Sequence, residues 1–137
     1  MKAVLDTNVI ISALISRDGP PARLFELWRA GGFEIVSSPL LLKELSVTLS
    51  RPKLRRYIPP NEAALTLSLI RSEAITVEDP AEAPSVASVD PHDDYLIALA
   101  EHSRSVLVSG DSDLLELADR IPVYSPRGFL DFLQHLA

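Results

Sequence analysis

Short apolar runs alternate with amphipathic stretches along this chain, which predicts β-strands alternating with α-helices. Strands are expected at residues 2–5, 33–36, 75–77, 105–109 and 121–124. Helices are expected at residues 8–15, 22–30, 39–50, 60–71, 90–102, 111–118 and 126–136. Start signals support these boundaries: Ser38 can cap a helix whose first residue is Pro39, for example.

This order of elements predicts an α/β fold with a parallel sheet of about five strands. Helices are expected on both faces of the sheet, which gives three layers in a single domain spanning residues 1–137. Residues 78–89, which contain Pro80 and Pro84, are expected to form a loop. The loop is long for a compact domain, and loops of such length are often functional or mobile.

The composition limits what this fold could do. The chain of 137 residues is 47% hydrophobic, which is enough for a sizeable core, and it contains no cysteine for disulfides or thiolate metal sites. Its first residues do not have the form of a signal peptide, and its apolar runs are far shorter than the roughly 20 residues of a membrane helix. We therefore expect a soluble, cytoplasmic protein with no membrane partner.

The net charge of −6 does not favour a protein that binds nucleic acid by bulk charge. Any contact with nucleic acid must therefore depend on local groups. A basic cluster could contact phosphates or could simply be solvated surface. It consists of Arg51, Lys53, Arg55 and Arg56.

Two aspartates are expected at one edge of the sheet. Asp6 directly follows the first strand, and Asp111 follows the strand at residues 105–109 after the single residue Gly110. Ligand sites of parallel sheets lie at the carboxyl ends of the strands, so these carboxylates meet if their strands are neighbours. Alternatively, both aspartates could have only structural roles: Asp6 could simply end a strand, and Asp111 could cap the next helix.

Two further acids lie near the starts of helices. Glu44 comes three and four residues after two leucines, and Asp94 comes three and four residues before two apolar residues, so both are expected on an inward side. Inward carboxylates are costly unless a cation meets them, and Mg²⁺ or Mn²⁺ prefers oxygen ligands. Either acid could instead lie on the surface. Asp93 is interpreted as a first-turn acid, and both possibilities stay open for Asp113.

Four segments give the chain a resemblance to the PIN domain, the nuclease fold of many bacterial and archaeal toxins. The first is DTNVIISAL at residues 6–14, and the second is Glu44-Leu45 followed by LSRPKL at residues 49–54. The third is DDYLIALA at residues 93–100, and the fourth is LVSGDSDLL at residues 107–115. Their order and spacing are similar to those of VapC-like ribonucleases, the toxins of toxin–antitoxin systems.

The resemblance implies which residues bind metal and RNA. By position, the catalytic and metal-binding acids are Asp6, Glu44, Asp94 and Asp111, with Asp113 as a fifth candidate ligand. Asn8 would orient Asp6, and the basic residues at positions 51, 53, 55 and 56 would hold phosphates flanking the scissile bond. Members of the family often have a basic residue where this chain has Gly110.

The activity implied by the resemblance is the hydrolysis of RNA phosphodiester bonds, in which Mg²⁺ or Mn²⁺ activates a water. The implied partners are an RNA substrate, a cognate antitoxin and a second copy of the chain. Self-association also fits the helix at residues 22–30, whose apolar residues lie on more than one side and could leave a patch exposed. These residues are Leu24, Phe25, Leu27 and Trp28.

Three functions are alternatives to a ribonuclease. A haloacid-dehalogenase-like phosphatase has a second aspartate two residues after the first, where this chain has Asn8. A receiver domain needs a late lysine, whereas no lysine follows Lys53. A PIN-fold module that binds RNA or protein without cleaving it remains the alternative. His92 could bind metal beside Asp93 or lie exposed in a loop.

Overall fold

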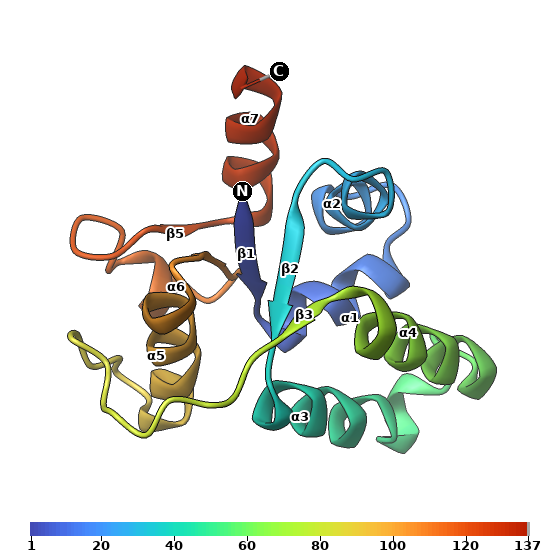
Figure 1. The fold of residues 1–137 in the computed structure, drawn as a ribbon. Coiled ribbons are helices and arrows are strands. Elements are labelled where there is room, and N and C mark those ends of the chain that lie inside the picture. The colour runs from blue at the N-terminus through green and yellow to red at the C-terminus, as the bar shows by residue number, and fades with distance from the viewer. Residues whose placement is uncertain (137) are drawn as a thin grey trace.

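All five strands join one parallel sheet in the computed structural model, which describes residues 1–136. The strands are β1 (Lys2–Leu5), β2 (Glu34–Ser37), β3 (Ile75–Thr76), β4 (Val106–Val108) and β5 (Val123–Tyr124). Their order is β3-β2-β1-β4-β5, so the first strand of the chain is the central strand of the sheet (Figure 1). The expected parallel sheet and the α/β class are confirmed.

Seven α-helices lie within the described residues, and each corresponds to an expected helix. They are α1 (Thr7–Ile15), α2 (Pro20–Arg29), α3 (Pro39–Leu49), α4 (Pro60–Glu73), α5 (Asp94–Ser103), α6 (Ser112–Leu115) and α7 (Pro126–Leu136). Two short 3₁₀ helices, η1 (Pro52–Leu54) and η2 (Pro91–Asp93), precede α4 and α5. The helix expected from residue 90 therefore begins with a 3₁₀ turn, and α6 is shorter than expected. None of the described helices combines the length and apolar character that crossing a membrane requires.

The side chains of each strand alternate between two buried clusters, because successive strand residues point to opposite faces of the sheet. On one face, Ala3 and Leu5 of β1 pack with residues of α1, α2, α4 and α7. On the other face, Val4 packs with residues of α5 and α6. Figure 1 shows α5 and α6 together on one side of β1 and β2, with α1, α2 and α4 on the other. The predicted three-layer arrangement is therefore confirmed.

Local sequence signals determine where three of these helices begin. The Asp6 side chain caps α1, Ser38 caps α3 and Asp111 caps α6, each by accepting a backbone N–H from the first helical turn. Asp6 and Asp111 are therefore helix caps as well as acids that follow strands. The two interpretations of these residues that the sequence left open are compatible.

Candidate functional site

Asp6 and Asp111 lie at the same edge of the sheet, since the strands before them are neighbours. β1 pairs with β4, with Leu5 opposite Val108, so the chain leaves both strands side by side. Ser109 connects the two acids: its hydroxyl donates to Asp6 Oδ2 at 2.9 Å and accepts the Asp111 backbone N–H at 3.0 Å. Ser109 is completely buried. Ser109 is not among the residues predicted from the sequence, although a hydroxyl two positions before a strand-end acid is a usable signal.

Asp6 is a nearly buried carboxylate, with 6% of its surface exposed. Its pKa is raised above the ordinary value mainly by burial, because a charged carboxylate is poorly solvated there. Hydrogen bonds from the Ser109 hydroxyl and the Asn8 backbone N–H partly oppose this shift. The charges of Glu44 and Asp111 add to it. Carboxylates from distant parts of the sequence therefore act on one another here.

The adjacent residues Asp93 and Asp94 have different surroundings in the structure. Asp93 is half-buried, and its pKa is raised to about 6, first by burial and then by the charges of Asp6, Asp111 and Asp90. The sequence pattern made Asp93 only a first-turn acid and placed Asp94 with the other carboxylates. In the folded chain, it is Asp93 that shares the electrostatic field of Asp6 and Asp111.

Asp94 is engaged by the loop at residues 77–90. Its Oδ1 accepts a hydrogen bond from the Ser88 backbone N–H at 2.8 Å and another from the Ser88 hydroxyl at 2.9 Å. Farther along α5, Glu101 accepts hydrogen bonds from the backbone N–H and the hydroxyl of Ser85. Seven residues separate the two acids, which is about two helical turns, so both lie on one face of α5. The loop is thus fastened to α5 at two points.

Glu44 reaches the site from α3 and is held by Tyr95. The Tyr95 hydroxyl donates a hydrogen bond to Glu44 Oε2, although 51 positions separate the two residues. Burial, followed by this contact and the Glu44 charge, raises the pKa of the Tyr95 hydroxyl, which therefore stays protonated and able to donate. Tyr95 could not be predicted as a site residue from the sequence, because no local spacing connects it with α3.

Three other positions singled out in the sequence have the following surroundings. Asn8 is exposed, and its backbone N–H rather than its side chain donates to Asp6, at 3.4 Å. The carboxylate of Asp113 is not among the charges that raise the pKa of Asp6 or Asp93. Gly110 does not have a positive φ, and a Cβ added there would meet no atom within 4 Å. Neither backbone strain nor lack of space therefore requires a glycine at position 110.

We refer to Asp6, Glu44, Asp93 and Asp111 as the carboxylate cluster. The ion pairs found among residues 1–136 join Arg17 to Glu62 and Arg29 to Glu73, so none of them neutralises this cluster. In the same part of the chain, no three Asp, Glu or His side chains lie in an arrangement that could hold a metal ion directly. The cluster is thus a group of neighbouring, mutually repelling carboxylates, which gives this edge of the sheet a negative potential.

The basic cluster predicted from the sequence is divided by the fold. Arg51 lines a groove that also contains Glu44, whereas Arg55 lines a separate pocket between α3 and α4. Lys53 and Arg56 are exposed and line neither of these cavities. Within the basic cluster, Arg51 therefore has the clearest connection to the carboxylates.

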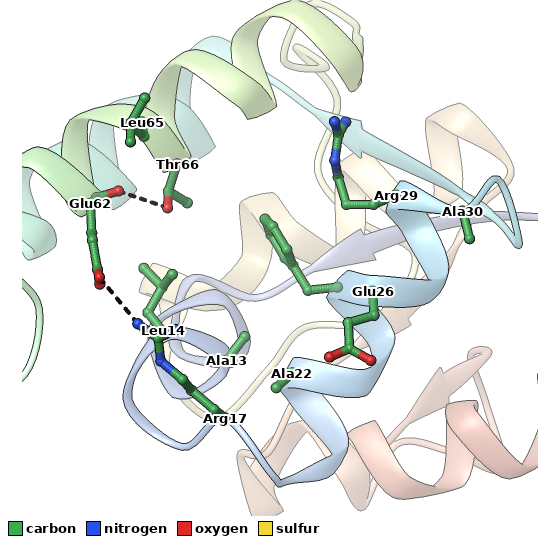
Figure 2. A pocket seen from close by; sticks show the side chains of 11 residues that line it. Ala13, Leu14, Arg17, Ala22, Glu26, Arg29, Ala30, Glu62, Leu65 and Thr66 are labelled. Carbon is green, nitrogen blue, oxygen red and sulfur yellow. Dashed lines mark hydrogen bonds and ion pairs between the residues drawn. The ribbon is translucent and has the colours of Figure 1, made fainter.

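A larger groove, of about 710 Å³, lies between α1, α2 and α4 (Figure 2), and none of its lining residues belongs to the carboxylate cluster. We call it the α1–α2–α4 groove. Leu14, Phe25 and Leu65 contribute apolar walls. Figure 2 shows Arg17 and Glu62 reaching toward each other at one end, where they form an ion pair of 3.1 Å. The patch expected on α2 is largely internal to the chain, since Leu24 and Trp28 are buried and Phe25 and Leu27 are partly buried.

Comparison with known structures shows the same fold in three proteins. PAE2754 from Pyrobaculum aerophilum superposes with a TM-score of 0.65 at 20% identity, covering 98% of this chain and 89% of that one. VapBC2 from Rickettsia felis, bound to a DNA fragment from their promoter, gives a TM-score of 0.62 at 17% identity and coverage of 91% and 98%. FitAB bound to an IR36 DNA fragment gives 0.62 at 17% identity, with coverage of 90% and 94%.

Sequence comparison is more specific. The uncharacterized protein MJ1680 of Methanocaldococcus jannaschii is 33% identical over 119 residues, which cover 87% of this chain and 76% of that protein. The characteristic sequence pattern of the PIN domain matches residues 2–113, which include all four members of the carboxylate cluster. The chain therefore belongs to the PIN domain family.

Proposed function

We propose that this chain is a metal-dependent endoribonuclease, which hydrolyses phosphodiester bonds in RNA. The observation that carries the proposal is the carboxylate cluster, in which the nearly buried Asp6 lies close to other negative charges. Such an arrangement is costly for a fold by itself. Clustered carboxylates have a function if they bind a divalent cation at the place where a phosphate reacts. Membership of the PIN domain family supports the same activity.

The donor chemistry of the cluster fits Mg²⁺ or Mn²⁺. Both ions prefer oxygen ligands, and Mg²⁺ usually keeps several waters while binding one or two carboxylates. The protein therefore need not surround the ion with its own side chains. Asp6, Glu44, Asp93 and Asp111 would hold it, some of them through its bound waters, with Asp93 taking the place that the sequence pattern gave to Asp94. When bound, the ion would stabilise negative charge on the phosphate and favour deprotonation of a water.

The residues around the cluster hold its carboxylates in position. The Ser109 hydroxyl fixes Asp6 Oδ2 while accepting the Asp111 N–H, so a shift of one acid is coupled to the other. The Tyr95 hydroxyl of α5 donates a hydrogen bond to Glu44 Oε2 and so fixes this carboxylate of α3. Groups held in place before the substrate arrives reduce the reorganisation that the reaction requires. Ser109 and Tyr95 are thus positioning residues.

Cleavage of an end-labelled, single-stranded RNA tests this proposal. We expect products in Mg²⁺ or Mn²⁺, no products in EDTA, and recovery when excess Mg²⁺ is added. The Asp111→Asn variant should be inactive, and the matched variant Asp119→Asn, which removes an exposed acid outside the cluster, should remain active. Full activity in EDTA or in Asp111→Asn would contradict the metal mechanism. RNA binding without cleavage under every condition would support the alternative, a non-catalytic binding module.

We further propose that the chain is the toxin of a toxin–antitoxin pair and that the α1–α2–α4 groove receives a helix of the antitoxin. The VapBC2 and FitAB structures, which share this fold, are DNA-bound complexes. The groove has apolar walls and a charged rim that includes Glu26 and Arg29, which suits an amphipathic helix. An inhibitor bound there would not need to contact the carboxylate cluster directly.

Co-expression with the product of a short neighbouring gene tests this partner. Leu65, which is 68% exposed in the groove, can be changed to Lys, and Leu136, which is 61% exposed outside it, provides a matched control. We expect Leu65→Lys to weaken the complex in size-exclusion chromatography and Leu136→Lys to leave it intact. Equal complex formation by both variants would show that the antitoxin does not use this groove.

A further inference from the structure

A second groove opens beside the carboxylate cluster and has a different character from the first. It has a volume of about 520 Å³ and lies between α3 and the residues that lead into α5, and we call it the α3–α5 groove. Glu44 and Tyr95 belong to its lining as well as to the candidate site. A molecule in this groove would therefore lie next to Glu44, one member of the carboxylate cluster.

The lining of the α3–α5 groove includes aliphatic residues of α3 and aromatic rings from η2 and α5. Leu40 and Val47 lie seven residues apart on α3, and therefore on one face of the helix, and they are 47% and 52% exposed. His92 of η2 and Tyr95 of α5 also line the groove. Exposed aliphatic and aromatic surfaces facing one slot suit a flat, partly apolar group, and a nucleobase is such a group.

The same groove contains two cations in an otherwise acidic protein. Lys43 and Arg51 line it, and neither takes part in the ion pairs found among residues 1–136. Lys43 lies within α3 and Arg51 follows the end of that helix, so they would contact different phosphates. Two cations without carboxylate partners, beside a cluster of acids and in a chain of net charge −6, fit a polyanion that approaches from α3.

We propose that the α3–α5 groove binds an unpaired nucleotide of the RNA, next to the phosphate that is cleaved. The base packs between Val47 and the ring of Tyr95, and the phosphates on either side contact Lys43 and Arg51. This proposal rests on the ribonuclease function proposed above, because it names the part of the substrate that lies beside Glu44. A base held in a Watson–Crick pair is not free to enter the slot, so the groove selects single-stranded RNA over duplex RNA.

Binding without cleavage tests this inference. The probe is a fluorescein-labelled oligouridine, its affinity is measured by anisotropy in EDTA, and a blunt RNA duplex is the comparison. The double variant Lys43→Ala/Arg51→Ala should weaken binding by about tenfold and reduce the salt slope by about 1.4, since single strands lose about 0.7 per phosphate contact. The matched double variant Arg23→Ala/Arg120→Ala removes two exposed cations outside the groove and should bind within twofold of the unmodified protein.

A second pair of variants tests the aliphatic part of the groove lining. Val47→Gln should weaken oligouridine binding by about fivefold without changing the salt slope, and Leu136→Gln, at an exposed leucine of α7, should not weaken it. Equal losses of affinity in Lys43→Ala/Arg51→Ala and in Arg23→Ala/Arg120→Ala would show that RNA binds by bulk charge and not at a defined site. Duplex RNA binding as tightly as oligouridine would overturn the base slot. If Val47→Gln turned a dimer into a monomer and left RNA binding unchanged, the groove would belong to a second copy of the chain.

The outcomes also separate this inference from the nuclease proposal. If oligouridine binds through the groove but no RNA is cleaved in Mg²⁺, the nucleotide site stands and the nuclease function fails. If the protein cleaves RNA and the groove variants bind and cleave as the unmodified protein does, the nuclease function stands and the nucleotide site fails. All the substituted side chains are exposed, so thermal unfolding should show that each variant remains folded.

Discussion

Replacing Asp93 and Asp94 in turn with asparagine gives a paired test of the site, because these adjacent carboxylates have opposite surroundings. Asp93 lies among the negative charges of the cluster, whereas Asp94 accepts two hydrogen bonds from Ser88. The substitution is nearly isosteric and removes one charge in each case. In EDTA at pH 7, we therefore expect the free energy of unfolding to rise for Asp93→Asn and to fall for Asp94→Asn.

The structure gives the size of each change. The pKa of Asp93 is raised from 3.8 to about 6, which corresponds to about 3 kcal/mol at about 1.4 kcal/mol per pKa unit. Screening by solvent at this half-exposed carboxylate reduces the expected gain to about 1 kcal/mol. At Asp94, a neutral amide oxygen replaces a charged acceptor, which weakens the contact with Ser88 by about 1 kcal/mol. In a domain of this size, each change shifts Tm by about 3–5 °C.

Thermal unfolding followed by circular dichroism in EDTA measures the stability of both variants, and cleavage of labelled RNA in Mg²⁺ measures their activity. Asp93→Asn should lose at least about 100-fold in cleavage rate because the metal and its water are held less well. Asp94→Asn should keep most of its activity. Tm changes of the same sign in both variants would refute the electrostatic reasoning. An inactive Asp94→Asn beside an active Asp93→Asn would refute the assignment of the cluster.

Four further predictions concern the pair Asp6–Ser109, the pH dependence of stability, position 110 and the oligomeric state. Ser109→Ala removes a buried hydroxyl that makes two hydrogen bonds, so urea unfolding should show a loss of about 1–3 kcal/mol and calorimetry a weaker affinity for Mg²⁺. Asp6 and Asp93 have raised pKa values in the folded chain, so they bind more protons folded than unfolded. The free energy of unfolding in EDTA should therefore decrease as pH rises from about 4 through about 6, and a flat profile would contradict the clustering. Gly110→Lys should fold with nearly unchanged Tm, because its Cβ meets open space, and should bind oligouridine more tightly in anisotropy. The protein should be a dimer by light scattering, and a monomeric mass at high concentration would contradict the self-association implied by its family resemblance.

The parts of the site that follow strands could be predicted from the sequence. A buried run that ends in an acid places that acid at the carboxyl edge of a parallel sheet, whatever the details of packing. Asp6 and Asp111 satisfied this rule, and the pairing of β1 with β4 brought them together. The role of Ser109 could not be predicted, because a serine at a strand end has many ordinary roles and 103 positions separate it from Asp6.

The choice between Asp93 and Asp94 could not be made from helical spacing. Such spacing identifies an inward face only if the helix also has an outward one, but α5 is buried at every position from Leu96 to Ala100. Both aspartates therefore lie three and four residues from buried side chains. The 3₁₀ turn Pro91–Asp93 before the helix also changes the direction of Asp93 relative to the α-helical pattern. Tertiary contacts, not periodicity, distinguish the two residues.

The two fastenings of the loop to α5 divide it into segments with different tolerance for changes of length. Residues 78–84 form a loop between two fixed points, Val77 at the edge of the sheet and Ser85 on α5. Doubling the length of such a loop costs only about 0.6 kcal/mol of stability. From Ser85 to Asp94, by contrast, each hydroxyl must meet its own acid on the helix. One residue inserted between Ser88 and Asp94 would change the spacing on which their contact depends. Insertions and deletions acceptable to a working protein should therefore accumulate before Ser85, while the distance from Ser85 to Asp94 stays constant.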